Sequence, residues 1–343
     1  METAIDQDKH FLVVGYGSIG QRHVKNIREM FPNALISILR HKNSLSKEVM
    51  LETGIANSFV SLQAAIESKP FLAILASPAT QHLDTAISLA EHGIHLLIEK
   101  PLAADCSGID TLMDTCHKRK VQLMVGYNLR FLPSLQKFRM LLHEKVVGEI
   151  FSVRAEVGQN LESWRPEQDY RDSVSAQQSL GGGVLLELSH EIDYLLWLFQ
   201  SITAVSSIVV KVSEMEIDVE DSAHVILKFE PFDNKKVYGT LSMDFVRLDP
   251  VRSCVVVGET GSLRWDCLKG TVEQFDHGEK RWDVVYAVPE VVSDSYKSEL
   301  SFCIDCIQRK TKPLPGGEEG YRVLAVIDAI RQSSTTQCWC SVL

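Results

Sequence analysis

Residues 11–20 read FLVVGYGSIG, an apolar run followed at once by three glycines and the start of a helical pattern. Gly15 suits the tight turn after a strand, Gly17 allows a pyrophosphate to approach the backbone, and Gly20 allows close helix–strand packing. The free N–H groups at the start of the helix, around Ser18 and Ile19, favour an anion. The stretch therefore predicts a dinucleotide-binding turn, with a purely structural turn as the alternative.

The same layout of apolar run and helical pattern repeats as far as residue 126. The first run is Phe11–Val14, and the later runs are Leu35–Leu39, Phe71–Ala76, His95–Ile98 and Gln122–Gly126. An amphipathic helix is expected over 81–92, with Gly93 at its end. Alternating strands and helices indicate a parallel sheet covered on both faces, so an α/β Rossmann fold over residues 1–127.

Beyond Pro133 the pattern changes to strands that follow one another with few helices between them. We expect strands at 149–158, 204–213, 222–230, 236–247, 252–257 and 262–266. One helix is expected over about 184–199, and a helix pair over about 294–309 and 318–333. This order is typical of a mostly antiparallel sheet, so residues 128–343 are predicted to form an α+β domain.

Composition excludes several classes of protein. The 35 basic and 45 acidic residues leave a formal net charge of −10, which disfavours nucleic acid as a partner. No apolar run reaches the ~18 residues of a membrane span, and the start METAIDQDKH does not resemble a signal peptide. Eight scattered cysteines favour reduced thiols and a cytoplasmic protein. The close pairs Cys303/Cys306 and Cys338/Cys340 fit zinc spacings poorly, so we expect no metal.

The residues after the second predicted strand bear on the choice of nicotinamide cofactor. NAD sites normally place a carboxylate about twenty residues after the glycines, on the ribose hydroxyls. Here the sequence continues Arg40, His41, Lys42, Asn43 and Ser44, without a carboxylate. Arg40 and His41 suit a 2′-phosphate, so NADP is favoured. NAD remains the alternative, with Arg40 against the adenine.

Several motifs together resemble the Gfo/Idh/MocA oxidoreductases. They are ASPATQH (76–82), GIHLLIEKPLA (93–103), GYNLRF (126–131), GGGVLLELSHEIDYLLW (181–197) and the closing GEEGYRVLAVIDAIRQS. The resemblance implies hydride transfer between NAD(P) and a sugar or cyclitol carbon, and a C-terminal domain built on an open sheet. It also implies a homodimer or homotetramer formed through that sheet, with Lys100 as active-site lysine, His190 as proton-transfer residue and a cis Lys100–Pro101 bond.

The Glu99-Lys100-Pro101 corner follows a buried strand without a polar spacer. Lysine is costly to desolvate unless its charge is used. At the end of a parallel strand, Lys100 is expected to point into the ligand crevice and to donate to the reacting hydroxyl. Pro101 restricts Lys100 to an extended backbone, and Glu99 is expected to pair with a neighbour near the cofactor. The alternative for Glu99 and Lys100 is a surface salt bridge.

His190 follows the glycine run 181–183 on the predicted helix. Histidine can accept the hydroxyl proton near neutral pH without a large pKa shift. Glu187 and Asp193 lie three residues before and after it, so one helical face would carry all three. The family has an aspartate where this chain has Leu186, and either Glu187 or Asp193 could replace it. The alternative is a structural histidine.

The remaining predicted contacts line the cofactor and sugar sites. Nicotinamide is expected beside Ser77, Pro78, Thr80 and His82, and Asn128 is also expected near the cofactor; a helix-terminal role is the alternative for His82. Sugar contacts are predicted for Tyr127, Arg130, Asp193 and, in the loop WRPEQDYR, for Trp164, Arg165, Tyr170 and Arg171. Aromatic rings suit a pyranose, and paired arginines suit an anionic substrate, unless they form salt bridges within the loop, for instance with Asp169.

We therefore predict an NAD(P)-dependent oxidoreductase that acts on the CH–OH group of a sugar, sugar acid, cyclitol or nucleotide sugar. The ammonium of Lys100 and the imidazole of His190, from separate domains, are expected to meet over one face of the nicotinamide. One alternative is a glycosidase that retains its cofactor, which would cause no net change in nicotinamide absorbance. Another is a non-enzymatic sugar sensor, although a sensor has no need of Lys100 and His190.

Overall fold

A computed structural model describes residues 9–40, 43–164, 167–230, 236–289 and 292–342. The chain forms two compact units. Unit 1 comprises the described residues up to Tyr127 together with Ser293–Tyr321, and unit 2 comprises Asn128–Val292 and Arg322–Leu343. The division expected from the sequence assigns residues 293–321 to the second domain, whereas they pack within unit 1.

Unit 1 is built on a six-stranded parallel sheet with the order β3-β2-β1-β4-β5-β6. Its strands are β1 His10–Val14, β2 Leu35–Leu39, β3 Asn57–Phe59, β4 Leu72–Leu75, β5 His95–Glu99 and β6 Leu123–Gly126. Phe11–Val14 and Leu72–Leu75 have no exposed surface, as expected for strands covered on both faces. The predicted Rossmann fold is confirmed. The sequence pattern missed β3, a short edge strand of half-buried residues.

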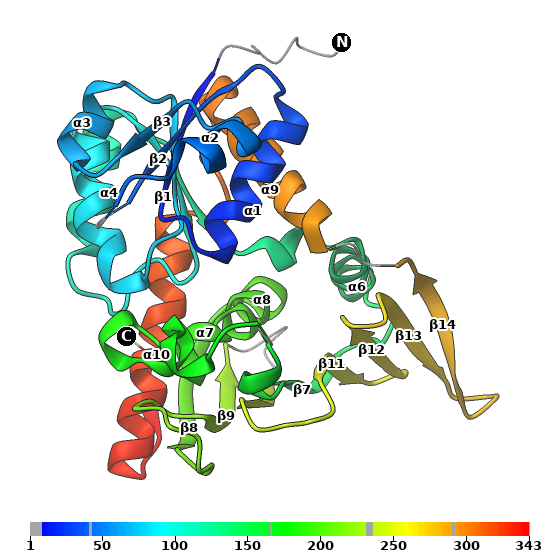
Figure 1. The fold of residues 1–343 in the computed structure, drawn as a ribbon. Helices are drawn as coiled ribbons and strands as arrows, with labels where there is room; N and C mark the ends of the chain where they lie inside the picture. The colour runs from blue at the N-terminus through cyan, green and yellow to red at the C-terminus, as the bar shows by residue number, and fades with distance from the viewer. Residues whose placement is uncertain (1–8, 41–42, 165–166, 231–235, 290–291, 343) are drawn as a thin grey trace. The chain divides into compact units, whose positions relative to one another are not determined.

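Helices cover both faces of this sheet. They are α1 Ser18–Met30, α2 Lys47–Thr53, α3 Leu62–Glu67, α4 His82–Glu91, α5 Ile109–Arg119 and the returning α9 Val292–Arg309. Figure 1 shows α1 and α9 on one face and α3 and α4 on the other. Lys297 of α9 forms an ion pair of 2.7 Å with Glu29 of α1, so residues far apart in the chain build one layer.

Unit 2 contains a nine-stranded sheet with the order β14-β13-β12-β11-β7-β10-β9-β8-β15. The strands are β7 Ile150–Gly158, β8 Ile202–Val210, β9 Ser222–Phe229, β10 Tyr238–Asp244, β11 Val251–Gly258, β12 Ser262–Asp266, β13 Thr271–Asp276, β14 Arg281–Ala287 and β15 Cys340–Ser341. Strands β7 and β10 are parallel, and the other neighbouring pairs described are antiparallel. The predicted mostly antiparallel sheet is confirmed, although β13, β14 and β15 were not predicted.

The helices of unit 2 are α6 Pro133–His143, α7 Val184–Glu187, α8 His190–Phe199 and α10 Gly317–Thr336, which begins in unit 1. The prediction of one continuous helix over 184–199 is wrong. Leu188 leaves the helical conformation (φ −100°, ψ 25°), and α8 starts again at His190. The apolar pattern could not reveal this break, because nearly every residue on both sides of it is buried.

Candidate active site

The glycine turn between β1 and α1 has the backbone that the sequence predicts. Gly15 has φ +93°, and a Cβ atom there would lie 2.7 Å from the carbonyl oxygen of Ala76. A Cβ atom on Gly20 would overlap the carbonyl oxygen of Gly15. A Cβ atom on Gly17, in contrast, would have no protein atom within 4 Å. Bulk is therefore excluded by the protein at Gly15 and Gly20, while Gly17 leaves room for a bound group. These residues fit a dinucleotide.

The first turn of α1 presents backbone N–H groups that no acidic side chain of that turn compensates, and a bound phosphate could accept from them. Its N-cap residue, Gly17, forms no side-chain cap, and the first turn contains no acidic residue. Ser18 is exposed and Ile19 half-buried at this helix start. The N–H groups and the helix dipole therefore keep a partial positive charge, which favours phosphate.

The ends of three neighbouring strands lead to predicted site residues. The order reverses between β1 and β4, and ligands of such sheets bind beyond the carboxyl ends of the strands at that reversal. Gly15 follows β1, Ser77 and Pro78 follow β4 as half-buried residues, and Lys100 follows β5. Exposed Thr80 lies in the 3₁₀ helix η1 (Ala79–Gln81).

Arg40 follows β2, which is the neighbour of β1 in the sheet. It is half-buried, and its backbone N–H donates to the carbonyl oxygen of Phe59 at 3.0 Å. Its predicted neighbour in the cofactor site, His41, lies outside the described residues. The backbone of Arg40 is thus anchored at the end of a strand, next to the position where a ribose is expected in this fold.

The Glu99-Lys100-Pro101 corner is held by a buried pair. The Nε2 atom of His23, on α1, lies 2.6 Å from Oε1 of Glu99. His23 has no exposed surface and Glu99 is 6% exposed, so Glu99 does not form the surface salt bridge considered above. The Lys100–Pro101 peptide bond is cis, as the resemblance implies. Lys100 itself is half-buried.

His82, at the start of α4, lies below the surface rather than at an open pocket edge. It is 1% exposed. Its Nε2 atom lies 2.8 Å from the carbonyl oxygen of Ser77, and its Nδ1 atom lies 3.1 Å from that of Pro101. Burial lowers the pKa of His82, and the two carbonyl groups oppose this effect because they favour a protonated ring. Both ring nitrogens thus face protein acceptors.

In unit 2, His190 is the first residue of α8 and is 8% exposed. Glu187 is the last residue of α7, and its Oε2 atom accepts a hydrogen bond of 2.9 Å from the hydroxyl group of Ser175. Because the helix breaks between them, Glu187 and His190 do not share one regular helical face. Of the three residues predicted to share one face, only His190 and Asp193 belong to the same helix, α8.

Two predicted substrate contacts form a buried ion pair with each other. Arg130 donates from Nε and Nη2 to the two carboxylate oxygens of Asp193, at 2.9 and 2.7 Å. Arg130 is 8% exposed and Asp193 is 1% exposed. Both oxygens of Asp193 thus accept bonds from one guanidinium group. Tyr127 and Asn128, which precede Arg130, are also buried.

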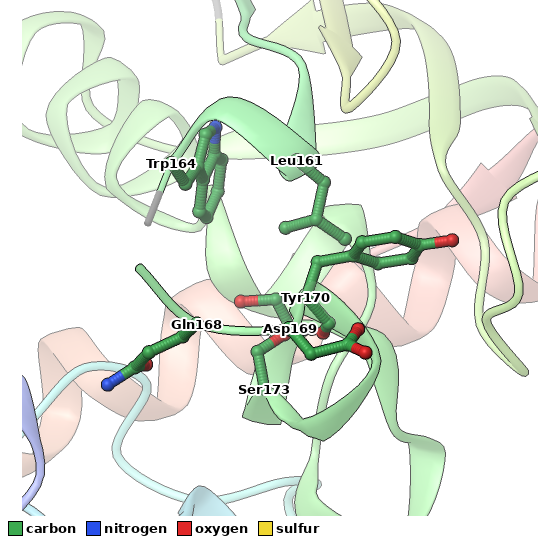
Figure 2. A pocket seen from close by; sticks show the side chains of 7 residues that line it. Leu161, Trp164, Gln168, Asp169, Tyr170 and Ser173 are labelled. Atoms are coloured by element: carbon green, nitrogen blue, oxygen red, sulfur yellow. Dashed lines mark hydrogen bonds between the residues drawn. The ribbon is translucent and has the colours of Figure 1, made fainter. Parts of the chain in front are cut away.

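A hollow of about 250 Å³, a volume that includes open solvent, lies beside the loop that contains Trp164 and Tyr170. Its lining also includes Leu161, Gln168, Asp169, Ser173 and Ser175. Figure 2 shows the rings of Trp164 and Tyr170 near Leu161, with the hydroxyl group of Tyr170 directed away. That hydroxyl accepts from the backbone N–H of Glu216 at 3.1 Å.

Ser175, one of the residues that line this hollow, donates from its hydroxyl group to Glu187 of α7. The ring of Trp164 packs against Phe245, with centroids 5.2 Å apart at 81°. The aromatic residues of the hollow and Glu187, which precedes His190 by three residues, therefore belong to one unit and are connected through Ser175.

The two loop arginines differ in what the structure describes. Arg171 is exposed and forms ion pairs with Asp169 and Glu216, at 2.5 and 2.6 Å. Hydrogen bonds from Arg171 lower the pKa of Asp169 to about 2. The predicted alternative of salt bridges within the loop therefore fits Arg171. Arg165 lies outside the described residues.

Comparison with known proteins agrees with this arrangement over both units. The NAD-binding Rossmann fold of an oxidoreductase family, Gfo/Idh/MocA, matches residues 9–127, and the C-terminal alpha/beta domain of the same family matches residues 139–342. The chain belongs to the Gfo/Idh/MocA oxidoreductases. Its glycine turn is accordingly part of a nicotinamide dinucleotide-binding domain.

Relatives of this Gfo/Idh/MocA protein match along nearly its whole length. Myo-inositol 2-dehydrogenase of Thermotoga maritima is 24% identical over 94% of this chain and 95% of its own. Glucose-6-phosphate 3-dehydrogenase of Bacillus subtilis is 23% identical over 92% of this chain and 93% of its own. A levoglucosan dehydrogenase structure in complex with NADH superposes with a TM-score of 0.86 at 20% identity, covering 98% of this chain and 99% of that one.

Other features of this Gfo/Idh/MocA oxidoreductase bear on partners. All eight cysteines are free thiols, as predicted. Among the described residues, no group of three or more histidine, cysteine or acidic side chains could hold a metal ion. No helix in the described part of the chain has the length and apolarity needed to cross a membrane.

Sequence reasoning missed two residues that the structure links to the candidate site. His23 was not predicted, although it lies three residues after Gly20 on the buried face of α1. Ser175 was not predicted either, since a single serine in a loop carries no pattern. A histidine that follows the glycine turn was the available signal for His23, but its partner could not be read from local sequence.

Proposed function

We propose that this protein is an NAD(P)-dependent dehydrogenase or reductase of a sugar, sugar acid, cyclitol or nucleotide sugar. The observation that carries the proposal is the match of both oxidoreductase domains to a chain that has Lys100 at the end of β5 and His190 at the start of α8. The relatives named above are dehydrogenases of a cyclitol and of sugars, which supports this substrate class rather than a glycosidase or a sensor.

The residues divide the work of oxidising a secondary alcohol. A nicotinamide, when bound, would supply the hydride acceptor. The cofactor contacts proposed are those predicted from the sequence except His82, whose two ring nitrogens face carbonyl oxygens of the protein. Lys100 donates a hydrogen bond to the reacting oxygen and stabilises negative charge there. His190 takes up the hydroxyl proton. We assign Glu187 rather than Asp193 as the carboxylate that assists His190, since both oxygens of Asp193 already accept from Arg130.

For the cofactor, we propose NADP, with NAD as the alternative. The sequence from Arg40 to Lys47 contains no carboxylate that could bind ribose hydroxyls, and Arg40 is anchored at the end of β2. An arginine at this place suits a 2′-phosphate. Titration of the protein with NADPH and NADH, followed by nicotinamide fluorescence, tests the preference. Arg40→Ser should weaken NADPH binding by at least about tenfold and leave NADH within about threefold. Equal losses for both would remove the proposed contact.

Of the two loop arginines, Arg165 is the one proposed to bind an anionic group of the substrate. Arg171 is engaged by two carboxylates, so its charge is already compensated. Trp164 and Tyr170 beside the hollow provide aromatic surface for the apolar face of a sugar ring. Kinetics of Arg165→Ala on charged and neutral sugars decide whether an anion is bound. A selective loss on the charged sugars supports the anionic substrate, and equal losses count against it.

The central experiment is a screen that follows nicotinamide absorbance. Myo-inositol, levoglucosan, glucose 6-phosphate and nucleotide-linked sugar acids would be tested with NADP and with NAD. A net change in absorbance with one of them supports the dehydrogenase. Hydrolysis of a glycoside without net change supports the glycosidase, and sugar binding without any turnover supports the sensor.

We also propose a homo-oligomer formed through the open face of the unit 2 sheet. Ile208, Ile226 and Tyr238 lie on the adjacent strands β8, β9 and β10, and they are 61%, 46% and 41% exposed in the single chain. Large apolar side chains on one face favour burial against another subunit. Sedimentation of the protein, with Ile226→Lys as the variant, tests the interface.

We further propose a cytoplasmic location, because free thiols persist in reducing compartments.

A further inference from the structure

Two buried histidines of unit 1 contact the two residues that flank Lys100. His23 reaches the preceding residue, because its Nε2 atom lies 2.6 Å from the carboxylate of Glu99. A carboxylate can only accept, so the ring donates. His82 reaches the following residue, because its Nδ1 atom lies 3.1 Å from the carbonyl oxygen of Pro101. Lys100 is thus bracketed by one histidine from α1 and one from α4.

The pair of His23 and Glu99 has little freedom to move. A Cβ atom on Gly126 would lie 3.1 Å from Oε2 of Glu99, so β6 confines the carboxylate from the side. The ring of Tyr296 on α9 meets the ring of His23 edge to face, with centroids 5.8 Å apart at 84°. Strand, helix and returning helix therefore hold the carboxylate in one place.

His82 joins the ends of two neighbouring strands. Its second ring nitrogen, Nε2, lies 2.8 Å from the carbonyl oxygen of Ser77, which follows β4, while Pro101 follows β5. One buried ring thus contacts both segments that leave the sheet, the one after β4 and the one after β5. With both ring nitrogens facing the protein, His82 has no ring nitrogen directed at a ligand.

We propose that His23 and His82 are positioning residues, which fix Lys100 in its working orientation through Glu99 and Pro101. The inference rests on the proposed function, in which Lys100 contacts the substrate. A hydrogen bond between buried groups adds little net stability, so the role of these contacts is sought in fixed geometry. His23 also belongs to the helix that begins at the glycine turn, so α1 bears on both the cofactor and the lysine.

The experiment compares each histidine substitution in two backgrounds, wild type and Lys100→Met, with the substrate that the screen identifies. His23→Leu and His82→Leu should each lower kcat by about 10–100-fold in the wild type, because a displacement near 1 Å of a reacting group costs that much. In the Lys100→Met background the same substitutions should change the residual rate by less than about twofold, since residues that act through one group are not additive. NADH affinity, followed by fluorescence, should stay within about threefold throughout.

Conservative variants and a matched control complete the design. His23→Gln keeps an N–H donor for Glu99 and should recover kcat to within about fivefold of wild type, whereas His23→Asn is too short to reach and should not. This comparison also serves if His23→Leu does not fold. His95→Leu changes a histidine at the opposite end of β5 and should have the same small effect on kcat in both backgrounds.

The outcomes are distinguishable. Normal turnover in Lys100→Met overturns the role of Lys100, and with it this inference. If Lys100→Met loses turnover and the histidine substitutions still lower its residual rate by the wild-type factor, the inference alone is overturned. Equal kcat values in His23→Gln and His23→Asn, at equal melting temperature, would also overturn it.

Discussion

The buried pair of Arg130 and Asp193 predicts a large loss of stability in Asp193→Ala. The side chains are 9% and 1% exposed, and two hydrogen bonds of 2.7 and 2.9 Å join them. Removing the carboxylate leaves a buried guanidinium without its counter-charge, which typically costs about 3–5 kcal/mol. For a unit of this size, 1 kcal/mol corresponds to about 2–4 °C, so the melting temperature of unit 2 should fall by ~6–20 °C.

Differential scanning calorimetry of the protein without ligand measures this fall, and two variants control it. Arg130→Met/Asp193→Leu removes both charges and should regain most of the lost stability, because apolar pairs often replace buried ion pairs without cost. Arg171→Ala breaks the exposed pairs with Asp169 and Glu216 and should shift the melting temperature by less than about 2 °C. A fall below about 2 °C in Asp193→Ala would refute the reasoning.

Three further predictions concern the cofactor turn, pH and turnover. The methyl group added by Gly17→Ala would meet no protein atom, so the melting temperature should stay unchanged while NADH binding weakens at least about tenfold. The methyl group added by Gly20→Ala would overlap the Gly15 carbonyl oxygen, so this variant should lower both the melting temperature and the NADH affinity. Unchanged NADH affinity in Gly17→Ala would contradict the predicted site. Burial, and to a lesser extent Lys9, lowers the pKa of His95, whose Nδ1 atom accepts from the N–H of Gln122 at 3.0 Å. Because the unfolded chain binds this proton more tightly, the stability that His95 contributes is present above about pH 6.5 and lost as the pH falls below it; urea unfolding midpoints at pH 7.5 and 5.5 should therefore differ less in His95→Asn than in the wild type, and an equal difference would count against the shift. Lys100→Met and His190→Ala should retain NADH affinity and lose about 10²–10⁴ in kcat, as measured by steady-state kinetics and fluorescence titration, and normal turnover in either variant removes that residue from the mechanism.

Local patterns carried much of the fold and part of the site. The apolar runs of unit 1 are continuous because both faces of the sheet are covered, so five of its strands could be located directly. The glycine turn could also be located, because a side chain at Gly15 or Gly20 would collide with neighbouring backbone atoms. The break between α7 and α8 could not be predicted, since periodicity carries no signal where residues on every side are buried.

The sequence by itself determined the dinucleotide-binding turn, the alternation of strands and helices, and the Glu99-Lys100-Pro101 corner at the end of β5, because each depends on neighbours along the chain. Only the tertiary structure decided which buried polar side chains meet. His23 pairs with Glu99 across 76 positions, and Arg130 pairs with Asp193 across 63. It also placed residues 293–321 in unit 1. Such pairings depend on which elements pack together. The sequence can indicate that a polar side chain will be buried and will need a partner, but it does not indicate which residue is that partner.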